Sequence, residues 1–419
     1  MSKMLLGYKN KNYRDLFLLC WAAYFSTYIC RLNFSAVMPE LSGGNVFSSS
    51  QIAAVSSAFF ISYGLGQFVS GVLGDKLNTR LMIFLGLTVS SVSNIMIFFF
   101  FNSFPILITL WAINGIVQSL VWSPVLKTAS IYFDKSDKEK FGIDISTTVP
   151  LGTLASYAVS LVTLIFLPWK YVFLTCGLCE LIFAVIWITG TKSLFKKLKP
   201  ITYNNLNTEN VKVMNFKSTL KLMLSSGVFI MLIPIAIQGT LKDSVTQWIP
   251  TFFSGNFGSA TSFSLALTMI LPIINVTGAY FAKALNKKIN NELTTSVIFF
   301  CISAVFLLIL KLFGSNSMVI SLVCMAAVTN CMFAINVMLI TMVPLWFNKS
   351  GRVSTIGGAL NAMAYIGCGA LNIIAGKILE NGSDWNLLFI MWLVLAIIAA
   401  ALSAICIPMW KRFIIKESE

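Results

Sequence analysis

Apolar residues fill long runs of this chain, and short polar segments separate one run from the next. Runs of about 20 or more mostly apolar residues are long enough to cross a bilayer as a helix. We predict twelve such helices, at residues 15–39, 50–74, 80–101, 105–133, 141–167, 169–190, 222–253, 259–285, 293–313, 317–346, 353–379 and 385–410. Because a helix satisfies its own backbone hydrogen bonds inside lipid, the pattern predicts an all-α polytopic membrane protein.

Composition and charge placement support this prediction. Of the 419 residues, 57% are hydrophobic and 11% are charged, which excludes an ordinary soluble domain. The net charge is +15, and 24 of the 30 basic residues fall in segments on one side of the predicted spans, against three on the other side. By the positive-inside rule, we expect both termini to be cytoplasmic, in the plasma or inner membrane. This placement argues against a nucleic-acid partner, and the nine cysteines, mostly in apolar helices, indicate packing rather than metal binding or disulfides.

The chain divides into two similar halves. We expect one six-helix bundle at residues 1–190, a basic cytoplasmic linker at 191–216 and a second six-helix bundle at 217–419. The segment Phe133-Asp134-Lys135-Ser136 follows the fourth span, and Phe347-Asn348-Lys349-Ser350 follows the tenth. Two pseudo-symmetric six-helix repeats indicate a transporter whose site lies between them near the midplane of the membrane.

The first predicted span contains an arginine, and a charge inside a membrane is costly unless it has a function or a partner. Tyr24, Tyr28 and Arg31 follow the spacing i, i+4, i+7 and therefore share one helix face. A guanidinium presents forked donors that suit phosphate or carboxylate groups. We therefore interpret Arg31 as an anion ligand, with a second cation expected from the other half.

Four further i, i+4 pairs of polar residues occur in other spans. They are Tyr63 with Gln67, Asn114 with Gln118, Gln238 with Lys242, and Asn361 with Tyr365. Each pair could form a hydrogen bond between helices or could line a polar cavity. Taken together, the pairs indicate a polar centre in the helix bundle, and all but Gln238 are candidate substrate-binding residues.

A loop motif lies between the second and third spans. Gly71, Asp75, Lys76 and Arg80 place a glycine before an acid and two basic residues, and Gly278, Ala282, Lys283 and Lys287 partly repeat the offsets in the second half. With Asn78, this motif resembles the loop motif of the major facilitator superfamily. The resemblance implies the twelve-helix fold of that superfamily and a gating role for these residues.

Within the superfamily, the chain resembles most the organophosphate:phosphate antiporters, which include glycerol-3-phosphate and hexose-6-phosphate transporters. The residues that carry this resemblance are Tyr24, Tyr28, Arg31, Asn33 and Ala36-Val37-Met38-Pro39, then Tyr63-Gly64, Asn114-Gly115, Gln118, Trp122, Pro124, Trp248, Pro250 and Tyr365. In that family, one arginine in the first span and one in the seventh hold the substrate phosphate. The resemblance assigns these positions to Arg31 and Lys242.

The chain also departs from that family. Gln67 stands where the family commonly has a lysine, and the chain has no histidine although the family uses one in the fifth span. Asp243 directly follows Lys242 and could neutralise it. The candidates for proton coupling are Glu180 and Asp243, with Asp144 near a helix end, and Glu180 could equally serve as a hydrogen-bonding partner between helices.

These observations lead to one main hypothesis and two alternatives. We expect a monomeric secondary transporter, without enzyme activity, cofactor or metal, that moves a phosphorylated or other small anionic metabolite by alternating access in exchange for inorganic phosphate. One alternative is a proton-coupled exporter of amphiphiles. The other is a transporter-like membrane sensor of sugar phosphate.

Overall fold

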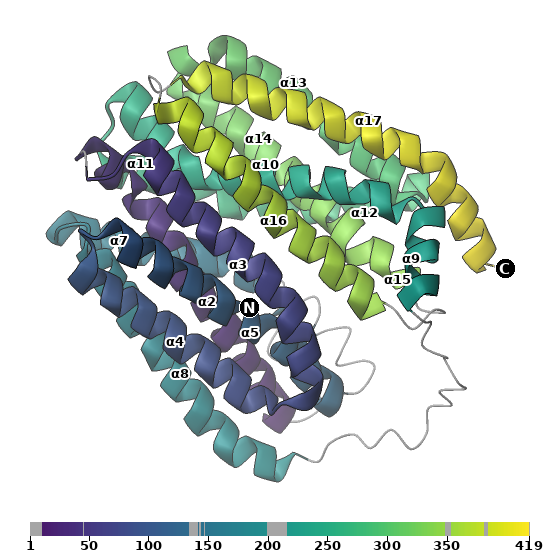
Figure 1. The fold of residues 1–419 in the computed structure, drawn as a ribbon, viewed down its shortest axis with the longest axis horizontal. Coiled ribbons are helices and arrows are strands. Elements are labelled where there is room, and N and C mark those ends of the chain that lie inside the picture. The colour runs from purple at the N-terminus through teal and green to yellow at the C-terminus, as the bar shows by residue number, and fades with distance from the viewer. Residues whose placement is uncertain are drawn as a thin grey trace. The chain divides into compact units, whose positions relative to one another are not determined.

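The computed structural model describes residues 11–44, 46–133, 141, 144–145, 147–198, 216–347, 353–380 and 384–418, and the regular elements in these ranges are helices (Figure 1). The first half contains α2 (Lys11–Gly43), α3 (Ser49–Lys76), α4 (Thr79–Phe100), α5 (Phe104–Tyr132), α7 (Thr148–Phe166) and α8 (Tyr171–Lys197). The second half contains α9 (Phe216–Ser225), α10 (Val228–Phe257), α11 (Thr261–Thr268), α12 (Ile270–Ile289), α13 (Glu292–Phe313), α14 (Met318–Asn336), α15 (Val343–Leu345), α16 (Val353–Glu380) and α17 (Trp385–Ser418).

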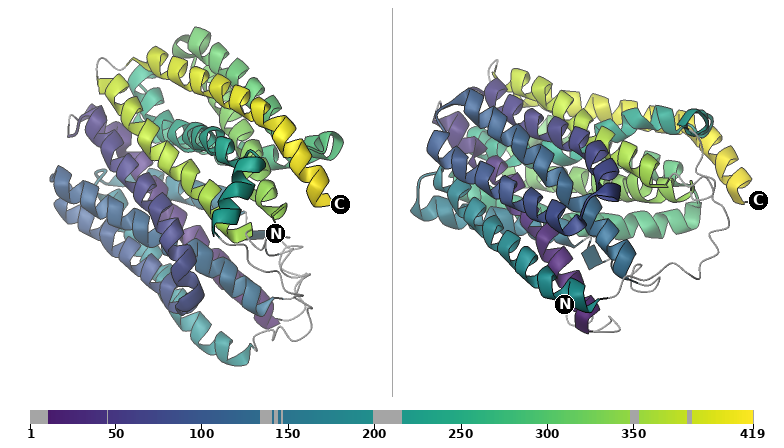
Figure 2. Two further views of the ribbon diagram at one scale, coloured as in Figure 1. Left: turned by 45° about the vertical axis from the view of Figure 1, so that its right-hand side comes forward. Right: turned by 60° about the horizontal axis from the view of Figure 1, so that its bottom comes forward.

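Eleven helical segments of the described chain are long and apolar enough to cross a membrane. The additional long helix is α2, which has 33 residues and carries Arg31. The structure therefore contains the twelve membrane-length helices that the hydrophobic pattern predicts. Figure 2 shows these helices from two further directions.

The boundaries differ from the predicted ones where the local backbone is irregular. Helix α7 begins at Thr148, seven residues after the predicted start of the fifth span. The predicted eighth span is divided between α11 and α12, because Pro272 has no backbone N–H to continue the helical bonding across the junction. In the tenth span, residues Val337–Met342 form a π-helix directly before Pro344. The first residues of the predicted linker, 191–197, continue α8.

The chain divides into two compact units by the density of its contacts. The first unit comprises Met1–Glu40 and Leu65–Asn207, and the second comprises Leu41–Gly64 and Thr208–Glu419. Helix α3 therefore contributes its first part to the second unit and its last part to the first unit. In the first unit α4 packs against both α5 and α8, and in the second unit α13 packs against α14 and α17.

Local contacts repeat between the two halves. Asn78 caps α4 by accepting a hydrogen bond from the backbone N–H of Arg80, and Asn291 caps α13 by accepting one from Thr294. The indole of Trp187 in α8 donates to the carbonyl of Arg80 at 2.9 Å, and the indole of Trp410 in α17 donates to the carboxyl of Glu292 at 3.0 Å. In each half, an indole of the sixth long helix thus donates to the first turns of the third, to a backbone carbonyl in one half and to a side-chain carboxyl group in the other.

The repeated loop segments show a second correspondence. Phe133 and Phe347 are both buried where they follow a helix. Phe133 packs on Phe141, and Phe347 packs on Phe413 with ring centroids 4.8 Å apart. The polar residues after each phenylalanine, at 134–136 and 348–350, lie outside the described residues.

Small residues allow α10 and α16 to approach closely within the second unit. A Cβ added at Gly239 would overlap with the backbone of Ala364, and one added at Gly367 would overlap with Ala236. The two helices lie side by side in both figures. Backbone contact of this kind is typical of helix crossings in membranes. There the hydrophobic effect does not drive helices together, and small residues allow the close van der Waals packing that does.

We predict that Gly367→Ala destabilises the protein by about 1–3 kcal/mol, because the added methyl group must push α16 away from α10. Gly358→Ala is the matched control: it lies in the same helix and has no other atom within 4 Å of its added Cβ. Thermal unfolding in detergent would measure both variants. Equal melting temperatures for the two variants would contradict the close crossing.

Candidate functional site

Helix α2 changes direction at Cys30, one residue before Arg31. Cys30 has φ −93° and ψ 15°, outside the helical region, so two helical segments meet there. The irregular backbone frees the Cys30 carbonyl, which accepts hydrogen bonds from Asn114 Nδ2 at 2.8 Å and from Gln118 Nε2 at 3.2 Å. On the following side of the kink, the Phe34 N–H donates to the side chain of Asn33 at 3.1 Å. The backbone groups that the kink releases are therefore satisfied by side chains, as burial requires.

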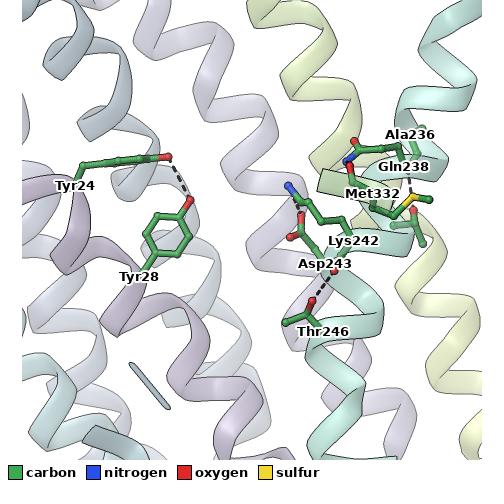
Figure 3. A network of polar contacts seen from close by, with 9 residues as sticks. Tyr24, Tyr28, Ala236, Gln238, Lys242, Asp243, Thr246 and Met332 are labelled. Atoms are coloured by element: carbon green, nitrogen blue, oxygen red, sulfur yellow. Dashed lines mark hydrogen bonds and ion pairs between the residues drawn. The ribbon is translucent and has the colours of Figure 1, made fainter. Parts of the chain in front are cut away.

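Arg31 lies on the same face of α2 as Tyr24 and Tyr28, as the spacing predicts. The Arg31 guanidinium lies over the ring of Tyr28, with Cζ 4.7 Å from the ring centroid. The hydroxyl groups of Tyr24 and Tyr28 are 3.3 Å apart and point toward each other in Figure 3. The Tyr24 ring also packs on Trp122, 4.5 Å between centroids. The Tyr28 ring thus supports the Arg31 guanidinium, and the two tyrosine hydroxyl groups lie on the same helix face.

Gln118 in α5 holds the Arg31 side chain directly. Arg31 Nε donates to Gln118 Oε1 at 3.0 Å, and only 7% of Arg31 is exposed. Gln118 and Asn114 are one helical turn apart and bond to each other at 3.2 Å. The predicted pair in this span thus forms hydrogen bonds between helices, and it also orients the candidate anion ligand.

A buried polar network extends from this point through α4 to α8. Ser90 Oγ lies 2.7 Å from Asn114 Oδ1 and 2.6 Å from Glu180 Oε2. Asn94 joins the same network, accepting from Asn33 at 2.8 Å and donating to the carbonyl of Ser90 at 3.0 Å. Glu180 is completely buried. The candidate coupling residue of the first unit is therefore connected to Arg31 through Ser90 and Gln118.

The second unit places Lys242 beside an acid. Lys242 Nζ is 3.4 Å from Asp243 Oδ2, and the two side chains are 12% and 25% exposed. Figure 3 shows the amino group of Lys242 directed toward the carboxylate of Asp243. Lys242 Nζ also lies 5.5 Å from the ring centroid of Tyr365 and 5.8 Å from that of Phe333. The structure thus brings Lys242, Asp243 and Tyr365 together in this unit.

Gln238, one turn before Lys242, forms a hydrogen bond between helices, which is one of the two roles that its spacing suggests. It is fully buried, and its Nε2 donates to the carbonyl of Met332 in α14 at 2.9 Å, so that it ties α10 to α14 (Figure 3). Just beyond Met332, α14 passes into the π-helix at Val337–Met342, and π-helical turns are frequent at functional sites. No feature of the sequence identifies this turn except Pro344 after it.

Other candidate residues occupy separate parts of the two units. Tyr63 packs edge-on against Tyr365 in the second unit, 4.6 Å between ring centroids, and Asn361 lies one turn before Tyr365 in α16. Gln67 is buried in the first unit. Tyr63 and Gln67 therefore share a helix but belong to different units.

The gating motif is described only in part. Gly71, Asp75 and Lys76 lie in α3, and their side chains are outside the described residues. Arg80 binds the C-terminal part of α8. Its Nε donates to Thr191 at 2.9 Å, and its Nη2 donates to the carbonyl of Ile188 at 2.5 Å. In the second half, Gly278 has no room for a Cβ because the backbone of Asn330 in α14 lies against it. Gly278, the counterpart of Gly71 in the second half, thus lies at a close crossing of α12 and α14.

Sequence reasoning missed a second polar cluster, which links α10 to α16 and to the first part of α3. Asn372 Oδ1 accepts from Trp248 Nε1 at 2.7 Å and from Ser244 at 3.2 Å. Gln247 Nε2 donates to Ser56 at 2.6 Å. These residues have no charge, and they come from three helices that are separated in sequence, so only the fold brings them together.

Comparison with known sequences places the chain in a family. The profile described as Major Facilitator Superfamily matches residues 20–356. A glycerol-3-phosphate transporter of Bacillus subtilis is 25% identical over 96% of this chain and 94% of its own length. A probable hexose phosphate transport protein of Chlamydia trachomatis is 27% identical, over 41% of this chain and 38% of its own length. The membrane sensor protein UhpC of Escherichia coli is 35% identical over 27% of this chain and 25% of its own length.

Solved structures share the fold. A bacterial homologue of the human lysosomal transporter Spinster, in an inward-facing and unoccupied conformation, superposes with a TM-score of 0.75 at 13% identity, covering 97% of this chain and 99% of that one. A D-xylose–proton symporter gives a TM-score of 0.72 at 13% identity, covering 93% and 96% of the two chains. These matches confirm the predicted fold class. The chain is a multi-pass membrane protein that belongs to the Major Facilitator Superfamily, a family of secondary transporters and not of enzymes.

Proposed function

We propose that this secondary transporter carries a phosphorylated or other small anionic metabolite by alternating access, in exchange for inorganic phosphate. The observation that carries the proposal is Arg31: a buried guanidinium held in place by a neutral amide and an aromatic ring. Relatives named as glycerol-3-phosphate and hexose phosphate transporters support the substrate class.

Arg31 is well suited to bind an anion because the group that accepts from its Nε is a neutral amide, which orients the guanidinium without neutralising its charge. Gln118 accepts from Nε through an amide oxygen, and the Tyr28 ring supports the guanidinium plane. A guanidinium fixed in this way loses little further freedom when it forms two parallel hydrogen bonds with a phosphate. The tyrosine hydroxyl groups on the same face would add donors for the remaining phosphate oxygens.

The same charge explains why transport would be exchange. A buried cation is costly when the protein closes around it, and a bound anion offsets that cost. Conversion between the outward-open and inward-open states would therefore be fast when an anion is bound and slow when the site is empty. A carrier with this property exchanges one anion for another.

Lys242 contributes less positive charge than Arg31 in this proposal. Its amino group is already paired with Asp243 at 3.4 Å. The joint role of Arg31 and Lys242 rests on the family resemblance of their two helices. We propose Arg31 as the principal anion ligand and the Lys242–Asp243 pair as the feature that tunes the charge of the site.

We predict that the correct anion raises the melting temperature of the wild type and that Arg31→Ala abolishes this effect. At a ligand concentration a hundredfold above the dissociation constant, the expected stabilisation is about 2.7 kcal/mol. Thermal unfolding with glycerol-3-phosphate, hexose-6-phosphate, inorganic phosphate and carboxylates would identify the ligand. Lys311→Ala, which removes a cation in the last turn of α13, is the matched control and should keep the full shift. An Arg31→Ala protein that is stabilised as strongly as the wild type would refute the assigned role.

We predict that Asp243→Asn increases affinity for the anion, because Lys242 then keeps its charge for the ligand. A partly exposed ion pair is worth up to about 1 kcal/mol, so the gain should be about two- to fivefold in the dissociation constant. Titration of the purified variant with the anion identified above would measure it. Unchanged or weaker binding would show that Asp243 does not compete with the ligand for Lys242.

We predict phosphate counterflow in vesicles that contain only this protein. Vesicles loaded with unlabelled phosphate should accumulate labelled phosphate, and vesicles without internal anion should not. The similarity to a membrane sensor makes this measurement decisive for function. Ligand binding without any counterflow would favour a sensor, and proton flux induced by a lipophilic cation would favour an exporter of amphiphiles.

A further inference from the structure

Ser90 lies at the centre of the buried network of the first unit, and its hydroxyl group has two short contacts with oxygen atoms. Ser90 Oγ is 2.7 Å from Asn114 Oδ1 and 2.6 Å from Glu180 Oε2. A serine hydroxyl carries one proton and can donate to only one of them. The protonation of the network can therefore be deduced by accounting for each donor and acceptor.

The two neighbouring amides have fixed orientations. Asn114 must direct its NH₂ group to the Cys30 carbonyl, which only accepts, so that its Oδ1 faces Ser90. Gln118 must direct its oxygen to Arg31 Nε, which only donates, so that its NH₂ group faces Ser90 at 3.2 Å. Neither amide can be turned over without facing a donor to a donor or an acceptor to an acceptor.

Asn114 Oδ1 also accepts from Gln118 Nε2 at 3.2 Å, but it carries no proton, so its 2.7 Å contact with Ser90 is a hydrogen bond only if Ser90 donates. The contact between Ser90 and Glu180, at 2.6 Å, is then a hydrogen bond only if the carboxyl group supplies the proton. The second carboxyl oxygen, Glu180 Oε1, is buried and has no N–H or O–H donor within the part of the chain that the structure describes, and the donor near the carboxyl group apart from Ser90 is the thiol of Cys30. An ionised carboxylate in this place would have only a weak thiol donor besides Ser90, at a substantial cost in free energy, whereas the uncharged carbonyl oxygen of a neutral acid costs less to leave weakly bonded.

We propose that Glu180 is a neutral carboxylic acid in this conformation and that its proton controls how much of the Arg31 charge is available to the anion. The acid donates to Ser90, Ser90 donates to Asn114, and Gln118 joins this chain to Arg31. Glu180 is thus a positioning residue that acts through Ser90 and Gln118, and the inference deepens the proposed function of Arg31.

The groups that surround Glu180 support this coupling. Arg31 and Cys30 in α2 act on the carboxyl group, and Cys176 lies near it in its own helix. Helices α4 and α5 face this region with Ser90 and Asn114, which do not titrate at any ordinary pH, and α7 faces Cys176 with Ser160. Among these groups in the described part of the chain, Arg31 is the one cation, so a negative Glu180 would compete with the substrate for it.

The consequence is that a proton and an anion favour each other's binding. When Glu180 loses its proton to water, the Ser90 hydroxyl turns to the carboxylate, Asn114 loses a donor, and Arg31 faces an internal negative charge. Because Glu180 is completely buried here, its proton can exchange with water only when the surrounding helices rearrange. Proton exchange is therefore tied to the conformational change of the transporter.

Glu292 provides a matched control because it is also buried but has a different set of donors. Its Oε1 accepts from the indole of Trp346 and its Oε2 from the indole of Trp410, both at 3.0 Å. Each oxygen thus has an N–H donor, and these hydrogen bonds need no proton on the carboxyl group. The two buried glutamates therefore differ in the donors that their oxygens have.

Infrared spectroscopy of the protein without substrate tests the protonation directly. The carbonyl stretch of a protonated carboxylic acid is absent from a carboxylate, so Glu180→Gln should remove such a band at neutral pH and Glu292→Gln should not. A spectrum in which Glu180→Gln removes no acid band overturns the proposal. If Glu180→Gln does not fold, Ser90→Ala decides, because loss of the acceptor must shift the acid band, and an unshifted band counts against the proposal.

Binding of inorganic phosphate as a function of pH tests the coupling. The affinity of the wild type should fall as pH rises, relative to Glu180→Gln, by about 5- to 150-fold, the usual range for two coupled sites. The titration of phosphate itself is common to both proteins and cancels in this ratio. Parallel pH profiles for the two proteins would overturn the coupling. Absence of phosphate binding to every protein, including the wild type, would contradict the proposed function while leaving the infrared result as a separate finding.

Discussion

The burial of one guanidinium in the middle of a membrane-length helix is the constraint on which the first unit depends. Arg31 is a charge that must be held away from lipid and oriented, and the structure does this by interrupting α2 at the residue before it. The interruption frees the Cys30 carbonyl, and that carbonyl in turn fixes Asn114 and Gln118. The kink, the two amides and the arginine therefore form one interdependent arrangement, in which each polar group is a hydrogen-bond partner of another.

The second unit also contains a cation within a membrane-length helix, but it stabilises that charge in a different way. Lys242 has a carboxylate as the next residue in the chain, so this charge is compensated locally. The polar cluster around Asn372 then ties α10 to α16 without any charge. The two halves share their fold and their cap contacts but differ in electrostatics. One half contains a cation held by neutral groups, and the other contains an ion pair.

The sequence predicted the parts of this arrangement that depend on local spacing. Hydrophobic runs predicted the helices, and the spacing of Tyr24, Tyr28 and Arg31 predicted their common face. The kink at Cys30 could not be predicted, because cysteine is not a helix breaker and the irregular backbone is stabilised by amides from α5, 84 and 88 residues further along the chain. The partner of Glu180 was equally hidden, since Ser90 is one of many small polar residues in apolar helices. Long-range hydrogen bonds with neutral residues leave no signature in one sequence.

The departures from the antiporter pattern become more informative once this geometry is known. The chain has no histidine, and Gln67 replaces a lysine that the related family commonly carries. Both differences remove positive charge, and Asp243 offsets Lys242. In the function that we propose, the attraction for an anion then depends more heavily on Arg31 than it would in a site with several cations. Any group that alters the charge near Arg31 has a correspondingly larger effect, and Glu180 is connected to it by an unbroken chain of hydrogen bonds. A carrier with fewer fixed cations can thus gain a requirement for a proton, because neutralising one acid restores the net charge that the missing residues would have supplied.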